Sequence, residues 1–315
     1  MRPFLMLLAW ALMAAPALAQ TAATIKIIVP STAGGGADTL ARLLGDQISR
    51  KQGQTIVVEN RPGASNTIGT EAVARAAHDG NTVLVTTPEF VINAHLKKLN
   101  YDPLTSFESV CYLVKSPQLI VVNAASPHRT LANLLDGARV KPGELTIASA
   151  GPASSPHIAI EALKHTARVN MNYIPYQGSA PAVNALLGGH VTAVMASYPN
   201  VAELVNTGRL RALATGTAAR IEPLPDVPTI AESGFKDFEA DIWFGLVAPA
   251  KTPSGALSQL AGWFTTALKD PEVTPKLATQ GLFPVGICGA AHAAFTQKQY
   301  DDYGRAIREA NIKAQ

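Results

Sequence analysis

The chain of 315 residues has 16% charged side chains and a formal net charge of +3 at pH 7. This near-neutral balance argues against nucleic-acid binding, which needs a concentrated basic face, and the length predicts two lobes of ordinary size. Its two cysteines, Cys111 and Cys288, are too few for a disulfide-rich scaffold or a four-cysteine zinc site.

Residues 1–19 predict a secretory signal peptide, cleaved after Ala19, and therefore a periplasmic location. Arg2 supplies a positive start, residues 4–15 form an apolar run, and Ala17-Leu18-Ala19 is a small-x-small cleavage site. Neither an uncleaved membrane anchor nor a lipid anchor is favoured, because the apolar run is short and no cysteine follows the cut. In an oxidising compartment Cys111 and Cys288 form either a disulfide or two separate buried thiols, and the sequence does not choose between them.

The mature N-terminal part predicts a βαβαβ lobe with parallel strands. Ile25–Val29 is an apolar run, followed by a glycine loop over residues 31–36 and by a helical pattern of leucines and isoleucine over residues 40–48. Thr55–Val58 and Thr82–Thr86 are further strands, with a helical pattern between them.

After Pro117 the alternation begins again and predicts a second α/β lobe. One helix opens with Ser155 as its expected cap and Pro156 at its first position. The expected strands are Leu119–Val122, Leu145–Ser149, Val169–Ile174, Val191–Ala196 and Leu210–Ala214.

The chain then returns to the first lobe. Prolines between residues 223 and 228 break regular structure, Ile242–Ala248 reads as a strand, and helices are expected at Leu257–Leu268 and Ala291–Ile312. We therefore expect lobe 1 to comprise residues 24–117 and 243–315, and lobe 2 residues 118–242. Two crossings, near residues 115–122 and 238–248, form a hinge that guides closure.

The glycine loop Ser31–Gly36 between a strand and a helix suits an anion. Glycines leave backbone N–H groups uncovered, and the helix N-terminus adds partial positive charge. The loop lacks the phosphate-loop and dinucleotide patterns, so taken alone it equally fits a tight turn. Asp38 is assigned to capping or to orienting the loop.

Residues Ser149–Ser155 form a second loop between a strand and a helix N-terminus, in the second lobe. Loops of this kind gather at the carboxyl ends of parallel strands, so the two are expected to face each other across a ligand. Each hydrogen bond to a charged group contributes about 1.5–3 kcal/mol, and micromolar affinity needs about 8 kcal/mol. Backbone N–H groups and hydroxyls are therefore sufficient for a carboxylate, and no arginine is required.

Short motifs in order through nearly the whole mature chain resemble the substrate-binding receptors of tripartite tricarboxylate transporters, the Bug (Bordetella uptake gene) family. They are Ile27–Arg42, Val57–Ala64, Asp79-Gly80, Tyr101-Asp102, His157, Pro175–Gly178, Leu187–Gly189, Arg220–Gly234, Ala248-Pro249 and Thr252-Pro253.

The resemblance implies a two-lobed type II periplasmic-binding-protein fold with two hinge crossings, no catalysis and no cofactor or metal. It implies capture of a small organic carboxylate (a di- or tricarboxylate, an acidic amino acid or an aromatic acid) and delivery to a separate membrane permease. A monomer is the simplest expectation. The family pattern has a glycine where this chain has Ala153, and Pro152 removes one N–H donor.

Carried over to this sequence, the resemblance places the ligand between two sets of residues. Those of the first lobe are Ser31, Thr32, Ala33, Gly34, Gly35, Ser65, Asn66, Thr86, Thr87 and Phe90; those of the second are Ser149, Ala150, Gly151, Ser154, Ser155, His157, Tyr176 and Ser197.

Three of the larger side chains have competing interpretations. His157 either meets the ligand or bonds to the adjacent loop, which we favour. Phe90 and Trp243 either stack on an aromatic ligand or pack in the core and hinge.

Two other functions compete with the receptor. A secreted α/β hydrolase would use Ser154 or Ser155 with His157, but the G-x-S-x-G pattern is absent. A cofactor-dependent oxidoreductase has no fingerprint in the sequence.

Overall fold

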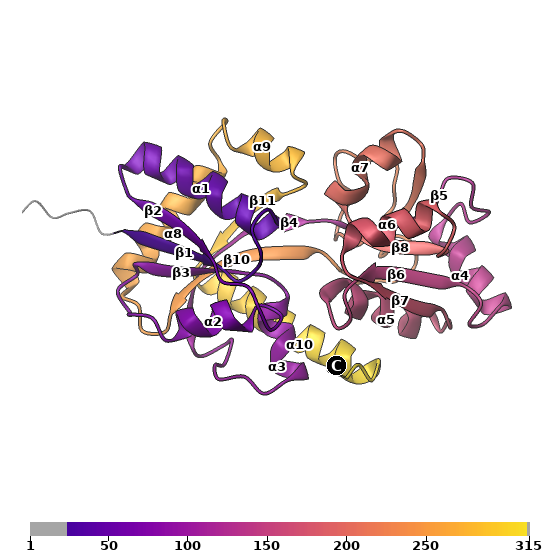
Figure 1. Cartoon of the computed structure of the whole chain (residues 1–315), viewed down its shortest axis with the longest axis horizontal. Helices are drawn as coiled ribbons and strands as arrows, with labels where there is room; N and C mark the ends of the chain where they lie inside the picture. Colours follow the sequence, from indigo (N-terminus) through magenta and orange to yellow (C-terminus); the bar gives the residue numbers. More distant parts are fainter. Residues whose placement is uncertain (1–23, 314–315) are drawn as a thin grey trace, which may run out of the picture.

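Two α/β lobes lie side by side along the long axis of the computed structural model, which describes residues 24–313 (Figure 1). The predicted signal peptide, residues 1–19, and its cleavage site lie outside the described residues. The two-lobed α/β fold expected from the sequence is confirmed.

The first lobe is built on a six-stranded sheet in the order β11-β4-β10-β3-β1-β2. Strands β1 (Ile25–Val29), β2 (Ile56–Asn60) and β3 (Thr82–Thr86) are parallel, as predicted. Strands β4 (Phe107–Ser116), β10 (Ile242–Pro249) and β11 (Phe283–Cys288) are antiparallel to their neighbours, so the complete sheet is mixed.

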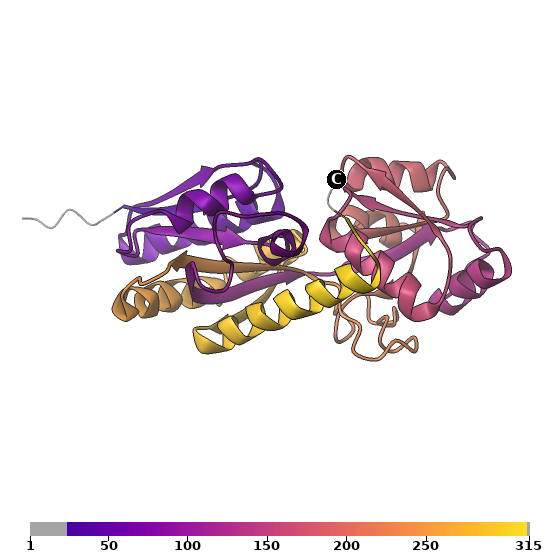
Figure 2. The ribbon, with the colours of Figure 1, turned by 90° about the horizontal axis from the view of Figure 1, so that it is seen from below.

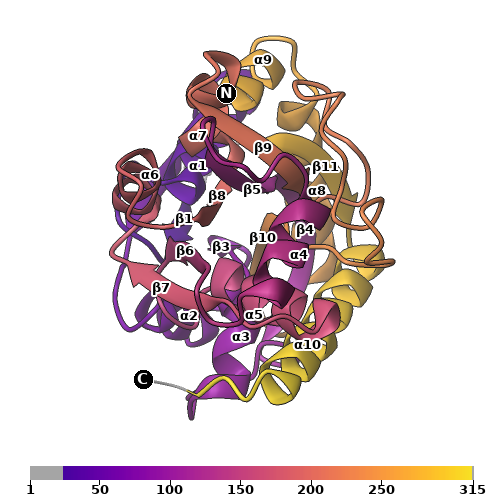
Figure 3. The ribbon, with the colours of Figure 1, turned by 90° about the vertical axis from the view of Figure 1, so that its right-hand side faces the viewer.

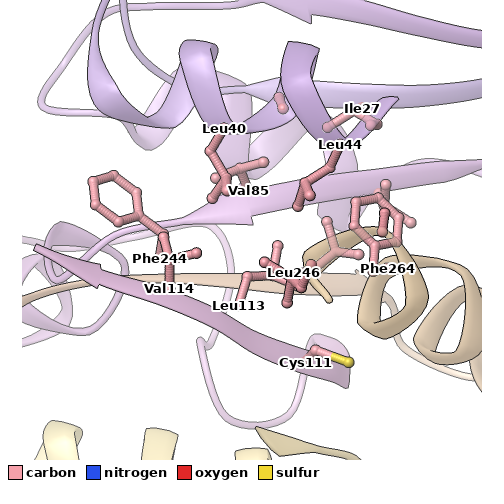
Figure 4. Close-up of a cluster of buried hydrophobic side chains, with 14 of the residues drawn as sticks. Ile27, Leu40, Leu44, Val85, Cys111, Leu113, Val114, Phe244, Leu246 and Phe264 are labelled. Atoms are coloured by element: carbon pink, nitrogen blue, oxygen red, sulfur yellow. The ribbon is translucent and has the colours of Figure 1, made fainter. Parts of the chain in front are cut away.

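Helices cover the first sheet: α1 (Gly36–Gln52), α2 (Thr67–Ala74), α3 (Glu89–Leu96), α8 (Ser254–Leu268), α9 (Thr274–Thr279) and α10 (Ala290–Glu309). The apolar spacing of α1 buries Leu40, Leu44 and Ile48 against the sheet. Figure 4 shows Leu40 and Leu44 above the strands and Phe264 of α8 in the same core.

The second lobe has a five-stranded sheet in the order β7-β6-β8-β5-β9. Its strands are β5 (Gln118–Asn123), β6 (Thr146–Ala150), β7 (Asn172–Tyr176), β8 (Ala193–Ser197) and β9 (Leu210–Thr215). Strand β6 runs parallel to β7 and β8, whereas β5 is antiparallel to β8 and β9. Its helices are α4 (Leu131–Val140), α5 (Ser155–Ala167), α6 (Ser179–Leu187) and α7 (Tyr198–Asn206).

The chain changes sheets at two places. Pro117 alone separates β4 from β5, and the return lies between β9 and β10. We propose lobe boundaries after residue 117, between β4 and β5, and after residue 242, the first residue of β10.

Two strands of the first sheet, β4 and β11, were not predicted, and they are joined covalently. Cys288 lies opposite Cys111 in the antiparallel pairing, and the two form a disulfide. The bond decides between the two interpretations that the sequence left open, and it ties the edge strand β11 to the sheet.

Candidate functional site

Strand register places both groups of candidate residues beside the crossings. Thr86, the last residue of β3, pairs with Gly245, the fourth residue of β10 after the crossing. Ser197, the last residue of β8, pairs with Gln118, the first residue of β5. The carboxyl ends of the parallel strands in each lobe therefore border the hinge and face the other lobe. Figure 3, seen along the long axis, has the second-lobe strands in front of β1, β3 and β10.

The turns leading into α1 and α5 have the same backbone conformation. Gly34 and Ala153 are left-handed, with φ of +85° and +55°. The next residues, Gly35 and Ser154, are extended helix caps with φ/ψ of −80°/172° and −83°/164°. Each lobe thus presents a helix N-terminus through the same turn, although the two sequences share few side chains.

Each turn is held by an acceptor four residues along the chain. The Gly34 N–H donates to Asp38 Oδ2 at 2.9 Å, and the Ala153 N–H donates to His157 Nδ1 at 2.9 Å. His157 therefore does in the second lobe what Asp38 does in the first. This contact supports Ala153 in a conformation that non-glycine residues rarely adopt, at the position where the family pattern has glycine.

The negative charge of Asp38 is paired with Arg42 of the same lobe. Burial alone would raise the pKa of Asp38, but hydrogen bonds from Arg42 and the Gly34 N–H lower it overall. Arg42 Nε lies 3.0 Å from Asp38 Oδ1, and Arg42 Nη2 donates to Asn60 Oδ1 at 3.0 Å. Asn60 in turn donates to the Ser31 carbonyl oxygen at 3.1 Å. Residues 32–36 remain exposed, so their backbone is open to a ligand.

The supporting loop of the first lobe is unusual because Ala64, Ser65 and Asn66 are all left-handed, with φ of +48°, +55° and +73°. Asn93 Nδ2 donates to the Ser65 carbonyl oxygen at 2.7 Å and holds this backbone. Asn66 Nδ2 reaches Thr87 Oγ1 at 3.3 Å, so these two predicted residues come together. Consecutive strained residues concentrate at functional sites. Asn93 was missed, and nothing in its helical pattern indicated it.

Two predicted residues of the first lobe are packed inside it. Phe90 is 3% exposed and meets the Phe107 ring edge-on at 5.1 Å. Thr86 is buried beneath Gly245, where a side chain would come within 2.6 Å of Thr86 Oγ1 and 2.8 Å of His292 Nε2. Trp243, also considered for stacking, is 1% exposed and donates from Nε1 to Gln299 Oε1 at 3.1 Å. These contacts favour the interpretation of Phe90 and Trp243 as packing residues of the core and hinge over stacking on an aromatic ligand.

The cap of α5 is Ser154, which corrects the assignment of Ser155. Ser154 has the extended backbone of a cap, and its Oγ accepts from the His157 N–H at 3.5 Å. The same hydroxyl donates to the Ala150 carbonyl oxygen at 2.6 Å. Ser155 is the first helical residue and is buried, which places Pro156 second.

Tyr173 locks the second loop and was not predicted, because nothing in its strand pattern sets it apart. Its hydroxyl donates to the Gly151 carbonyl oxygen at 2.8 Å and lies 3.0 Å from Ser149 Oγ, which is fully buried. The His157 ring stacks on Tyr173 with 3.9 Å between centroids. Burial lowers the pKa of His157, so the ring stays neutral and Nδ1 can accept. The favoured interpretation of His157, a bond to the adjacent loop, is confirmed.

Tyr176 and Ser197 are the last residues of β7 and β8, the two strands that flank β6. The Tyr176 carbonyl oxygen accepts from the Gly151 N–H at 2.8 Å, which joins β7 to the loop. Ser197 precedes α7 and lies opposite Gln118. Gln118 was missed; it is 2% exposed, and its Oε1 accepts no hydrogen bond within residues 24–313.

Comparison with known proteins identifies the family. Residues 40–312 match the model of the tripartite tricarboxylate transporter family receptor, TctC. Protein BugT of Bordetella pertussis is 34% identical over 305 residues, which cover 95% of this chain and 94% of BugT. The chain belongs to this receptor family.

Solved structures of similar proteins agree with this membership. The periplasmic binding protein BugD matches with a TM-score of 0.77 and 32% identity, over 93% of this chain and 99% of BugD. Rpa4515 of R. palustris, solved with adipate, matches with a TM-score of 0.77, 31% identity and coverage of 93% and 98%. MatC of Rhodopseudomonas palustris, solved with malate, matches with a TM-score of 0.75, 28% identity and coverage of 90% and 98%.

Members of this receptor family are binding proteins, so the chain is a solute-binding receptor and not an enzyme. The hydrogen bonds fit this conclusion, since the Ser154 hydroxyl donates to backbone carbonyls and the His157 imidazole accepts from backbone. Within residues 24–313 no three His, Cys, Asp or Glu side chains gather as a metal site. No helix in this range is both long and apolar enough to cross a bilayer.

Proposed function

We propose that this receptor works in the periplasm, captures a small organic carboxylate between the two matched turns, and delivers it to a tripartite-type membrane permease. The observation that carries the proposal is the equivalence of Gly34-Gly35 and Ala153-Ser154. The two turns have one backbone conformation, each is secured by an acceptor four residues along, and each leads into a helix N-terminus beside the hinge.

The chemistry of the turns favours an anion held by backbone. The side chains closest to each turn already have partners: Arg42 binds Asp38 and Asn60, and the Ser154 hydroxyl binds Ala150. Uncovered N–H groups at a helix N-terminus are donors that suit a carboxylate oxygen. Two such turns suit a ligand with a carboxylate at each end, and the similar proteins solved with adipate and malate support this class.

The proposal can be tested with substitutions at the two helix caps, Gly35 and Ser154. Aspartate is a favourable cap, and Gly35 has an extended backbone with only ordinary contacts around an added Cβ. Gly35→Asp therefore adds negative charge without disturbing α1. Ser154→Asp keeps a favourable cap for α5 but loses the donor to the Ala150 and Gly151 carbonyl oxygens, so the Gly35 pair is the cleaner test. The controls are Gly35→Asn and Ser154→Asn, which have the same shape and no charge. Gly34 is unsuitable, because its left-handed φ would strain any side chain.

A thermal-shift panel of adipate, malate, citrate, glutamate and terephthalate selects the ligand, and calorimetry measures its affinity. We expect each aspartate variant to weaken binding by at least about tenfold, or about 1.4 kcal/mol, relative to its asparagine control. Equal affinities for the aspartate and asparagine members of both pairs would show that the turns do not hold the carboxylate.

Export and delivery require separate measurements. We expect cell fractionation to find the chain in the periplasm with an N-terminus at Gln20. We expect membrane vesicles that contain a cognate permease to take up the selected carboxylate only when the receptor is added. Uptake at the same rate without the receptor would contradict the delivery step.

A further inference from the structure

A cavity of about 520 Å³ lies on another side of the hinge and shares no residue with the proposed carboxylate site. Its walls come from both lobes: α5 and residues 235–241 on one side, and β4, β10 and α10 on the other. Figure 2 shows α10 running beneath the first lobe toward the second. The volume is in the range of sites for small molecules, about 300–1,000 Å³.

Aromatic rings form much of the wall on the side of the first lobe. They are Tyr112 of β4, Trp243 of β10, and Phe295 and Tyr303 of α10. The Tyr112 and Phe295 rings are stacked at 4.3 Å, and Trp243 meets Phe295 edge-on at 5.6 Å. The opposite wall is also apolar, with Ile158, Ala159 and Ala162 of α5 and the rings of Phe235 and Phe238. The cavity therefore suits an apolar body.

The charge of the lining is negative. Among the lining residues, Lys298 and Arg305 both bind the carboxylate of Asp302. Counted together, the lining has three cations, Lys236, Lys298 and Arg305, against five carboxylates: Asp302 and, in addition, Asp237, Glu239, Asp241 and Glu309. The uncompensated charge favours a cationic ligand.

Asp241 is the lining carboxylate with an unused acceptor. Its side chain is 9% exposed, and its Oδ1 accepts no hydrogen bond within residues 24–313. Its Oδ2 forms an ion pair with Lys115 Nζ at 3.6 Å, and the carboxylate also accepts from the Gln118 backbone N–H. Buried polar atoms normally have a hydrogen-bond or charge partner, so Oδ1 is the one atom of this carboxylate, within the described residues, that a ligand could still satisfy.

We propose that this hinge cavity binds a small organic cation with an apolar body, such as an aryl-substituted ammonium, whose charge lies between Asp241 and the aromatic wall. Aromatic faces attract cations through their quadrupole, and a nearby carboxylate adds direct attraction. The site is distinct from the proposed carboxylate site in place and in the sign of the charge that it accepts, and neither depends on the other.

Calorimetry at pH 8 with three probes of similar size tests the proposal. The probes are benzyltrimethylammonium, benzyl alcohol and phenylacetate, which are cationic, neutral and anionic. We expect the cation to bind with a dissociation constant of about 1 mM or below and the other two at least about tenfold more weakly. Equal binding of all three probes, or no binding of the cation at 20-fold this concentration (about 20 mM), would overturn the proposal.

Variants then locate the site. Asp241→Asn should weaken the cation at least about tenfold, and the exposed-rim variant Glu239→Gln about two- to threefold. Val140→Ala, at an 80% exposed position away from the lining, serves as the control. If Asp241→Asn does not fold, Phe295→Leu replaces it and should also weaken the cation, because it removes the central ring. Unchanged affinity in the folded Asp241→Asn or Phe295→Leu variant would place the cation elsewhere.

Discussion

Hydrogen bonds from individual side chains decide what the candidate site offers to a ligand. Ser149, Ser154 and His157 were predicted as ligand contacts, yet Ser154 and His157 are bonded to their own loop and Ser149 is bonded to Tyr173 of β7. Polar groups already satisfied by the protein have less to gain from a ligand than uncovered N–H groups. We infer that these side chains shape the turn and that the backbone makes the contact.

The two turns should respond differently to acid, because one is held by Asp38 and the other by His157. Nδ1 of His157 accepts a hydrogen bond only while it carries no proton, and the pKa of His157 is below 6.5 because of burial. The unfolded chain therefore takes up this proton first as pH falls below 6.5. The contribution of His157 to stability is complete above pH 6.5 and is lost as pH falls toward its folded pKa. The pKa of Asp38 is lowered, so the first turn keeps its bond over this range.

We expect carboxylate affinity to fall at least about threefold between pH 7 and pH 5 in the natural chain, because the second turn loosens. In His157→Asn the decrease should be clearly smaller, since the asparagine oxygen accepts from the Ala153 N–H at both pH values, as Asp38 does for Gly34. Calorimetry at the two pH values with a ligand that stays ionised checks this. An equal decrease in both proteins would mean that His157 is not the group responsible.

The disulfide acts at the level of the secondary-structure element. Strand β11 is at the edge of the first sheet and pairs with β4 alone, through a ladder interrupted between Pro284 and Ile287. Proline cannot donate to a ladder, and an edge strand with an irregular register is weakly held. The disulfide between Cys111 and Cys288 compensates for this weak pairing by tying β11 covalently to β4. It also joins positions 177 residues apart in the chain.

Replacing both cysteines with serine should lower the free energy of unfolding by about 2–4 kcal/mol, because the unfolded chain regains the freedom of a long loop. Carboxylate affinity should stay within about twofold, since neither cysteine belongs to the two turns. Urea unfolding and calorimetry measure the two quantities. A stable double variant with impaired binding would instead link β11 to the ligand site.

The last helix connects the lobes at the scale of the whole molecule. Ile307 of α10 forms a small buried cluster with Ile92 of α3 and Ile158 of α5. Since α3 belongs to the first lobe and α5 to the second, this cluster is a contact between lobes beyond the two crossings. When the lobes close on a ligand, this cluster has to be preserved or formed again. A decrease in the radius of gyration would report the closure.

Ile307→Ala should cost about 2–4 kcal/mol of stability, because a large side chain that is 5% exposed leaves a cavity. Hydrogen exchange should accelerate in both α3 and α5, which belong to different lobes. Val140→Ala, at an 80% exposed position, should change stability by less than about 0.5 kcal/mol. Acceleration confined to α10 would show that the cluster does not join the lobes.

The sequence by itself determined the parallel βαβαβ unit, the second α/β alternation after Pro117, the positions of the two strand-to-helix loops and the family. These features are local, because strand and helix periodicity and glycine turns depend on residues that are close together in the chain. Strand β6 was predicted to within one residue, whereas β7 begins at Asn172 rather than Val169. Val169 and Met171 are apolar and suggested a longer strand, but residues 169–171 belong to the irregular segment between α5 and β7.

Only the tertiary structure decided which partners distant residues find. Strands β4 and β11 form because the first sheet offers them antiparallel neighbours, and Cys111 meets Cys288 through that pairing. The cap position at Ser154 depends on a backbone angle, and the roles of His157 and Tyr173 depend on a loop that brings β6, β7 and α5 together. Such contacts join segments that are far apart in the chain, and periodicity within one segment contains no information about them.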